Sequence, residues 1–405
     1  MNLKLAWRNT WRNKRRSAIA IASITFGVFF SCLMLSTQLG SYSRMIDNAV
    51  RFHTGYIQVH AKGFWDDKTI DNSMVLTEDV LETIRQARYV EVVAPRIESF
   101  ALASYGEKTK GAMVIGMDPE SEDNLTRVKS KLAEGAYLEA SDQAALIGQG
   151  LAKYLGLKVG DTLVMISRGF HGVNAAAKYP VKGIVKIPIP DLNNQLIYLP
   201  LKESQWFFDA SERVTALALV IDDADHVDRT VKYLAARLPQ EEFEVMGWRE
   251  MMPELVQSIE LDYVSGIILM FILYAVIGFG IFGVFLMMTN ERAYEFGILL
   301  SIGMKRGKLR QVVFIEAILV GLIGVLAGVA LSLPIIAYLH FNPIQMGGEY
   351  AAMFEEFGLE PVMPFSLDPV IFFRQAIIVL IMSTLIAIYP LFKISRLDPV
   401  RAIRQ

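Results

Sequence analysis

The chain has 405 residues, of which 53% are hydrophobic and 20% are charged, so it is more apolar than a typical soluble protein. Its formal net charge of -2 conceals an uneven distribution of charge along the sequence. Residues 41–262 carry 24 basic and 33 acidic side chains, and this acidic balance argues against a nucleic-acid partner. The single cysteine, Cys32, excludes an intramolecular disulfide.

Four runs of the sequence are long enough and apolar enough to cross about 30 Å of hydrocarbon. They predict transmembrane helices over residues 18–40, 263–290, 312–339 and 370–391. The first run is longer than the apolar core of a cleavable signal peptide, which has about 7 to 15 residues, so we expect a retained anchor. The remaining segments are a basic N-terminal segment (1–17), a large domain (41–262), a connecting loop (291–311), a short loop (340–369) and a tail (392–405).

Lys and Arg are concentrated in three short places, residues 1–16, 290–310 and 391–405. The short loop contains no Lys or Arg, and its acidic residues are Glu349, Glu355, Glu356, Glu360 and Asp368. Because short cytoplasmic flanks carry the excess of positive charge, both termini and the 291–311 loop are expected in the cytoplasm. The large domain and the short loop are expected on the opposite side of the membrane.

The large domain mixes strand and helix patterns. Short β-rich runs occur at 56–60, 113–116 and 163–166. Amphipathic helices are predicted from Thr77 to about Ala87 and from Asp222 to Leu238. We therefore predict a membrane α-helical protein with four transmembrane helices and a large mixed α/β domain between the first two. A hairpin-like excursion from Arg168 to Tyr179, rich in Gly, Ala and Asn, is open to two interpretations, a mobile contact loop or an ordinary solvated loop.

Catalytic patterns are absent from the sequence. No P-loop occurs, since the string from Gly303 to Leu309 has the wrong spacing. The five histidines show no metal-ligand spacing, and no G-x-S-x-G motif is present. We expect no catalytic residue, no metal and no directly bound cofactor. Glu316 is the one acidic residue inside a predicted span, and both a helix-packing role and a proton site remain open for it.

Residues 290–306 join the second and third predicted spans and combine charged with apolar side chains. Glu291 and Glu295 lie one helical turn apart. The apolar residues of the same segment are Phe296, Ile298, Leu299, Leu300 and Ile302. The pattern is typical of either a docking site for another protein or an interfacial helix on the lipid surface.

Several strings resemble one family. Residues 291–306 read E-R-x-x-E-x-G-I-L-x-x-I-G-M-K-R, and residues 396–404 read R-x-D-P-x-x-A-I-R. Together with Leu5–Asn9 and the segment from Ala145 to Asp161, they resemble the ABC permease superfamily that includes LolC/LolE, MacB and FtsX. The resemblance favours docking as the role of the 290–306 segment and covers essentially the whole chain.

The resemblance implies a bacterial inner-membrane permease that works with a cytoplasmic ABC ATPase dimer and a second permease copy or paralogue. ATP and Mg would bind to the ATPase, which is expected to be a separate polypeptide, and hydrolysis would move the periplasmic domain by mechanotransmission. Membrane lipid and a periplasmic lipoprotein, carrier or adaptor are the further partners implied. The docking residues carried over by position are Glu291, Arg292, Glu295, Gly297, Ile298, Leu299, Gly303 and Lys305.

Three outputs are compatible with this resemblance: release of lipoprotein or other amphipathic cargo from the inner membrane, MacB-like export of a periplasmic substrate, and FtsX-like signalling to a cell-wall hydrolase. We expect the first. Small residues in the spans let helices approach closely, either within one subunit or across a dimer interface. The candidates for this packing are Gly278, Gly283, Gly324 and Gly328.

Overall fold

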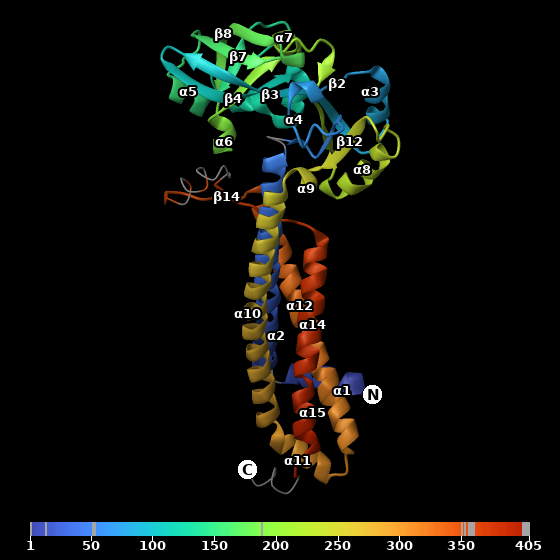
Figure 1. Ribbon diagram of the computed structural model, residues 1–405. Helices are drawn as coiled ribbons and strands as arrows, with labels where there is room; N and C mark the ends of the chain where they lie inside the picture. The colour runs from blue at the N-terminus through green and yellow to red at the C-terminus, as the bar shows by residue number, and fades with distance from the viewer. Residues whose placement is uncertain are drawn as a thin grey trace. The chain divides into compact units, whose positions relative to one another are not determined.

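The computed structural model describes residues 2–12, 14–50, 54–187, 189–349, 351, 354 and 361–398 (Figure 1). The chain forms two compact units. One comprises residues 1–44, 258–345 and 362–405, and the other comprises residues 45–257 and 346–361. The first unit is helical, and the second is built around a β-sheet.

Four helices of the first unit are long and apolar enough to cross a membrane. They are α2 (Lys14–Ala49), α10 (Pro253–Glu291), α12 (Arg306–Phe341) and the pair α14 (Pro369–Ile386) and α15 (Ile388–Ser395). The prediction of four long apolar helices is confirmed. Each helix extends beyond the apolar run that predicted it. A 36-residue helix measures about 54 Å, well over the hydrocarbon thickness of about 30 Å.

Glycines on α12 allow close contact with α2 of the same chain. A Cβ atom on Gly324 would lie 2.7 Å from the Cβ of Ile24, and one on Gly328 would lie 2.6 Å from the Cβ of Val28. The hydroxyl of Thr25 donates a hydrogen bond of 3.1 Å to the Gly324 carbonyl. These glycines therefore pack within one subunit, in the close helix approach that small residues permit.

The two candidate glycines of α10 differ from each other. A Cβ on Gly278 would meet the Sδ of Met382 on α14 at 3.4 Å, which is ordinary contact. A Cβ on Gly283 would have no described atom within 4 Å. Close helix packing within the chain therefore involves Gly324 and Gly328, and the surface at Gly283 is open.

Two short strands, β13 (Ile344–Gln345) and β14 (Val362–Met363), pair next to the ends of α12 and α14. The chain after β14 packs on α2, where the Ser36 hydroxyl donates to the Ser366 carbonyl at 2.7 Å. Some residues named in the sequence predictions lie outside the described residues. They are Glu355, Glu356 and Glu360 of the short loop, and residues 399–404 of the tail.

The second unit contains one sheet of ten strands, six of which close into a barrel. Around the barrel, each strand pairs with the next, and β7 closes the ring by pairing with both β8 and β3. The barrel strands, listed in the order in which they pair, are β3 (Val90–Tyr105), β4 (Lys108–Met117), β9 (Leu196–Pro200), β6 (Ala145–Gly148), β8 (Asn174–Val185) and β7 (Thr162–Arg168). Alternate residues such as Ala101, Ala103 and Met165 point into an apolar core.

The 16-residue strand β3 belongs to two parts of the sheet. Its second half lies in the barrel, and its first half pairs with β11 (Ala216–Ile221). The sheet then continues through β1 (Ile57–Ala61) to β12 (Phe243–Gly247), with antiparallel pairing throughout. At the junction, the guanidinium of Arg96 makes hydrogen bonds of 2.7 and 2.8 Å to the Glu122 carboxylate, and both side chains are fully buried.

Helices cover the sheet and complete the mixed α/β fold that was predicted. They are α3 (Glu78–Arg85), α4 (Pro119–Thr126), α5 (Gln149–Leu155), α6 (Pro190–Asn193), α7 (Leu201–Phe207), α8 (Val227–Ala235) and α9 (Trp248–Met251). The remaining strands are β2 (Met74–Val75), β5 (Leu132–Gly135) and β10 (Arg213–Val214). The runs at 56–60, 113–116 and 163–166 fall on β1, β4 and β7, and the two predicted amphipathic helices fall on α3 and α8.

The stretch from Arg168 to Tyr179 is the hairpin that its sequence suggested, and its two ends are paired strands where a loop was expected. It forms the end of a β-hairpin in which β7 pairs with β8 from Arg168 opposite Asn174 onward. The turn is fixed to the rest of the unit by two backbone donors. The Phe170 N–H donates to the Phe208 carbonyl at 2.7 Å, and the His171 N–H donates to Asp71 Oδ1 at 2.6 Å. Asn174 and the three alanines after it are strand residues of β8, whereas Gly169 and Gly172 lie in the turn.

Candidate functional site

The segment between α10 and α12 forms a short helix, α11 (Ala293–Ser301). Arg292 interrupts the helical path after α10, with φ of -98° and ψ of 6°. The helix ends at Gly303, whose φ of +97° lies in the left-handed region that glycine adopts readily. The N–H groups of Gly303 and Met304 donate to the carbonyls of Leu300 and Leu299 at 3.1 and 3.0 Å. This pattern is a Schellman motif, so Gly303 sets the length of α11.

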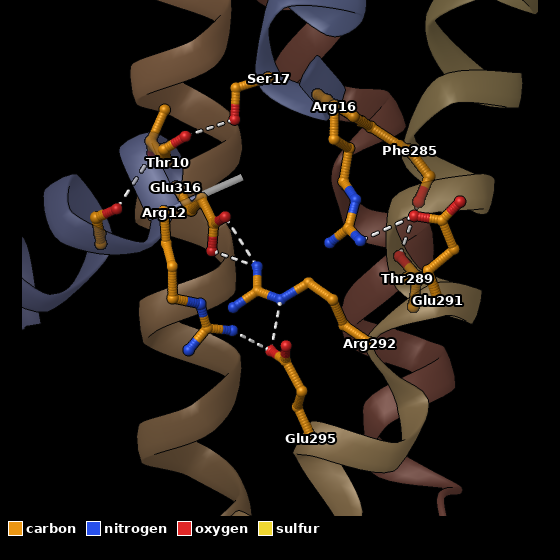
Figure 2. Close-up of polar contacts among 11 residues, drawn as sticks. Thr10, Arg12, Arg16, Ser17, Phe285, Thr289, Glu291, Arg292, Glu295 and Glu316 are labelled. Carbon is orange, nitrogen blue, oxygen red and sulfur yellow. Dashed lines mark hydrogen bonds and ion pairs between the residues drawn. The ribbon is translucent and has the colours of Figure 1, made fainter. Parts of the chain in front are cut away.

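Arg292 ties α11 to α12 through a buried ion pair (Figure 2). Its Nη1 lies 2.7 Å from both carboxylate oxygens of Glu316, and the two side chains are only 8% and 4% exposed. Its Nε also donates to Glu295 at 3.3 Å. Charge-assisted hydrogen bonds in a buried setting hold the two groups in one geometry. Glu316 is therefore engaged by a cation from the start of α11.

Two arginines from the N-terminal part of the chain reach the same region (Figure 2). Arg12 donates to the Glu295 carboxylate, and Arg16 lies 2.7 Å from the Glu291 carboxylate. Arg12 ends a short helix, α1 (Asn2–Arg12), for which the sequence predicted only a basic segment. The ion pairs therefore connect α1 to α11 and α2 to the end of α10.

The inner side of α11 packs on an apolar cluster. Phe296 is 2% exposed and packs with Leu309 and Val313 of α12 and with Ile394 of α15. The guanidinium of Arg306 holds the end of α15 by donating to the carbonyls of Ser395 and Leu397 at 2.8 and 3.1 Å. Because both polar and apolar contacts fix α11, it is attached rigidly to α12 and α15.

The outer side of α11 carries an exposed apolar stripe. Tyr294, Ile298 and Ile302 recur every fourth residue and therefore lie on one face of the helix. Their exposed fractions are 51%, 38% and 75%. Large apolar side chains that share one exposed face mark a binding surface for another molecule. We refer to these three residues as the outer stripe.

The residues predicted for docking take different positions. Ile298 belongs to the outer stripe, and Lys305 is exposed at the N-terminal cap of α12. Gly297 is buried, and Leu299 packs beside the apolar cluster. Three further members take part in the ion pairs described above: Glu291, Arg292 and Glu295. Tyr294 and Ile302 were missing from the predicted set, although the four-residue spacing to Ile298 was visible in the sequence.

Two known protein families match this chain along most of its length. Residues 17–237 match the MacB-like periplasmic core domain, and residues 267–399 match the FtsX-like permease C-terminal region. The second match contains the whole α11 region.

Curated relatives extend over both matched regions. The lipoprotein-releasing system transmembrane protein LolC of Xylella fastidiosa is 25% identical over 324 residues, which are 77% of this chain and 77% of the relative. LolE of Haemophilus influenzae is 20% identical and covers 80% of each chain. The macrolide export ATP-binding/permease protein MacB of Campylobacter jejuni is 21% identical and covers 82% of this chain but 53% of the relative.

Among solved structures, the periplasmic region of MacB from Actinobacillus actinomycetemcomitans aligns with 53% of this chain and 97% of that chain, at 17% identity and a TM-score of 0.37.

Proposed function

Because the chain belongs to the family of FtsX-like permeases with a MacB-like periplasmic core domain, we propose that it is the permease subunit of an ABC transporter driven by a partner ATPase. The chain is an ABC-type permease, and its sequence contains no P-loop. ATP and Mg would bind to the partner. The observation that carries the proposal is the outer stripe, an exposed apolar face on a helix that is otherwise firmly attached.

The proposed docking surface is the outer stripe of α11 at the cytoplasmic side of the membrane. Lys305 and the neighbouring Arg306, Lys308 and Arg310 supply the positive charge typical of cytoplasmic flanks. Both termini would share this side. A groove on each ATPase subunit would receive the stripe, as grooves receive apolar helix faces elsewhere.

Force applied to α11 would pass into the spans through the contacts that attach it. The buried pair of Arg292 and Glu316 connects α11 to α12, and the pair of Arg16 and Glu291 connects the end of α10 to α2. The helix α10 continues without interruption for 39 residues, from Pro253 to Glu291. An uninterrupted helix of this length can act as a lever, so ATP-driven movement of the ATPase would be transmitted to the periplasmic domain.

The cargo we propose is a lipoprotein or another amphipathic molecule released from the inner membrane. Support comes from the relatives named as lipoprotein-releasing proteins, which match this chain over more than three quarters of both lengths. The second permease of the complex would be another copy or a paralogue. Mass spectrometry of molecules that co-purify with the ATPase complex would test the cargo. Recovery of a soluble substrate with an outer-membrane channel, or of a cell-wall hydrolase, would contradict it.

The docking surface can be tested by introducing charge into the outer stripe. We expect Ile302→Glu and Ile298→Glu to reduce the amount of ATPase that co-purifies with the tagged full chain, because a carboxylate would have to be desolvated at the interface. Ile344→Glu is the matched control, since Ile344 is 47% exposed and lies on β13 away from α11. Equal ATPase recovery from Ile302→Glu and the control would refute the assignment.

A further inference from the structure

The N-terminal helix α1 has one face packed on protein and two faces that are exposed. Ala6 and Thr10 are buried, and α1 lies against α12. The exposed aromatic face carries Trp7 and Trp11, 49% and 46% exposed, with ring centroids 5.8 Å apart. Beside it, basic residues recur every fourth position at Lys4, Arg8 and Arg12. Tryptophan next to Lys and Arg on one helix is typical of the membrane interface.

A groove of about 850 Å³ lies between α1, α11 and the start of α12. Its volume falls within the range of about 300 to 1,000 Å³ that is usual for small-molecule sites. The walls are mainly apolar and come from all three helices. They include Trp7 and Trp11 from α1, Leu299 from α11, and Leu309 and Val312 from α12. Ile298, a member of the outer stripe, also borders the groove.

The charges at the groove are unbalanced. Three guanidinium groups line it, from Arg8, Arg12 and Arg292, against the single carboxylate of Glu295. Arg12 and Arg292 both pair with Glu295, and Arg292 also pairs with Glu316. Arg8 is exposed and has no acidic partner within the part of the chain that the structure describes. The groove therefore presents an uncompensated cation beside apolar walls.

We propose that this groove binds one anionic phospholipid from the leaflet on the α1 side. The phosphate would contact the Arg8 guanidinium, which matches phosphate oxygens in a bidentate geometry. An acyl chain would follow the apolar walls of the groove. A lipid fits better than a polypeptide because α2, the first apolar span, begins at Lys14, only two positions after α1 ends. That short connection keeps α1 at lipid level.

A lipid bound in the groove would affect the position of α11. Residues of both α1 and α11 line the groove, and the two helices are joined by the ion pair of Arg12 and Glu295. A bound lipid would fill the space that otherwise separates the two helices. The inference rests on the groove itself and does not depend on the ATPase partner.

The test is native mass spectrometry of the full chain in detergent, without ATPase, titrated with phosphatidylglycerol or phosphatidylcholine. We expect one phosphatidylglycerol to bind more tightly than the rest and more tightly than phosphatidylcholine. Arg8→Gln should weaken that site about tenfold, the scale of one lost charged hydrogen bond, and Arg8→Lys should restore part of the affinity. Arg15→Gln is the matched control, because Arg15 is exposed near the same end but does not line the groove.

Equal affinity of Arg8→Gln and Arg15→Gln, or equal binding of the two lipids, would overturn the proposal. A photoreactive phosphatidylglycerol provides a second readout that does not depend on Arg8. We expect it to label peptides 5–12 and 298–313 in the full chain. Labelling confined to other segments would contradict the site. If purified ATPase cross-links to α1 through the groove walls in lipid nanodiscs and no lipid label is found there, the occupant is the ATPase and the lipid proposal fails.

Discussion

Arg292, which precedes α11, and Glu316 of α12 form a buried ion pair in which Nη1 of the arginine lies 2.7 Å from both carboxylate oxygens. We predict that Glu316→Gln lowers the free energy of unfolding by about 3 kcal/mol, because removing one partner leaves the other charge buried and incompletely neutralised. Chemical denaturation in detergent would measure the loss, and hydrogen exchange over residues 293–301 would show whether α11 loosens.

A matched control comes from the neighbouring exposed pair. The side chains of Arg12 and Glu295 are 59% and 42% exposed, so Arg12→Gln should cost less than about 1 kcal/mol. Replacing both buried partners, as in Arg292→Met with Glu316→Leu, should restore most of the stability because neither charge remains buried. If Glu316→Gln unfolds like the unmodified chain, the pair is not what attaches α11.

The glycines of the spans predict two different effects of the same substitution. Gly328→Leu should destabilise the subunit, because a Cβ there already meets the Val28 Cβ at 2.6 Å and overpacking costs about 1 to 3 kcal/mol. A Cβ at Gly283 has no described neighbour within 4 Å. Gly283→Leu should therefore leave subunit stability unchanged. Thermal unfolding in detergent and the mass of the complex by light scattering would separate the two.

The same pair of variants tests where a second copy would pack. A change in complex mass caused by Gly283→Leu alone would place an interface on that face of α10. A complex that dissociates in Gly328→Leu, with the subunit still stably folded, would instead show that Gly328 lies between subunits and would contradict the packing against α2.

The sequence predicted the apolar helices and three of the strands, β1, β4 and β7, because both kinds of element depend on local patterns. Runs of about 20 apolar residues and alternation over a few residues are readable without a fold. Closure of the barrel was not predictable, because it depends on β3 pairing with β7 more than 50 residues later in the chain, as at Leu102 opposite Ile166. The hairpin at Arg168–Tyr179 joins two strands that are consecutive in the chain, so the local sequence could indicate it.

At the candidate site, the sequence located the helix but not its faces. Phe296 and Ile302 are both apolar and lie six residues apart, yet one is 2% and the other 75% exposed. Only the packing of α12 and α15 decides which side of α11 is covered. Arg12 lies 283 positions before Glu295, so no local pattern could connect them.

Gly303 was predicted to contact the ATPase, and its backbone conformation also sets the end of α11. We predict that Gly303→Ala destabilises the end of α11 by about 1 kcal/mol, because a Cβ disfavours the left-handed conformation at φ +97°. Hydrogen exchange at the Met304 amide, which closes the motif, would report the fraying. Gly307→Ala is the control, since Gly307 lies within α12 with open space around it, and alanine there should stabilise the helix.

The buried side chain of His60 predicts that the stability of the α/β unit depends on pH. It is fully buried on β1, its Nδ1 lies 3.2 Å from the Ala61 carbonyl, and its Nε2 has no partner among the described groups. Burial lowers the pKa of His60 below its ordinary value.

The unfolded chain takes up a proton near pH 6.5 and the folded chain does so only at lower pH. Stability is therefore complete above about 6.5 and falls as the pH drops toward the folded-state pKa. Tryptophan fluorescence of the full chain, to which Trp65 beside His60 contributes, would follow denaturant unfolding at pH 7.5 and 5.5. His60→Phe should reduce the difference between the two values, whereas His171→Phe, in the exposed turn, should leave it intact. A difference of the same size in all three proteins would show that another group is responsible.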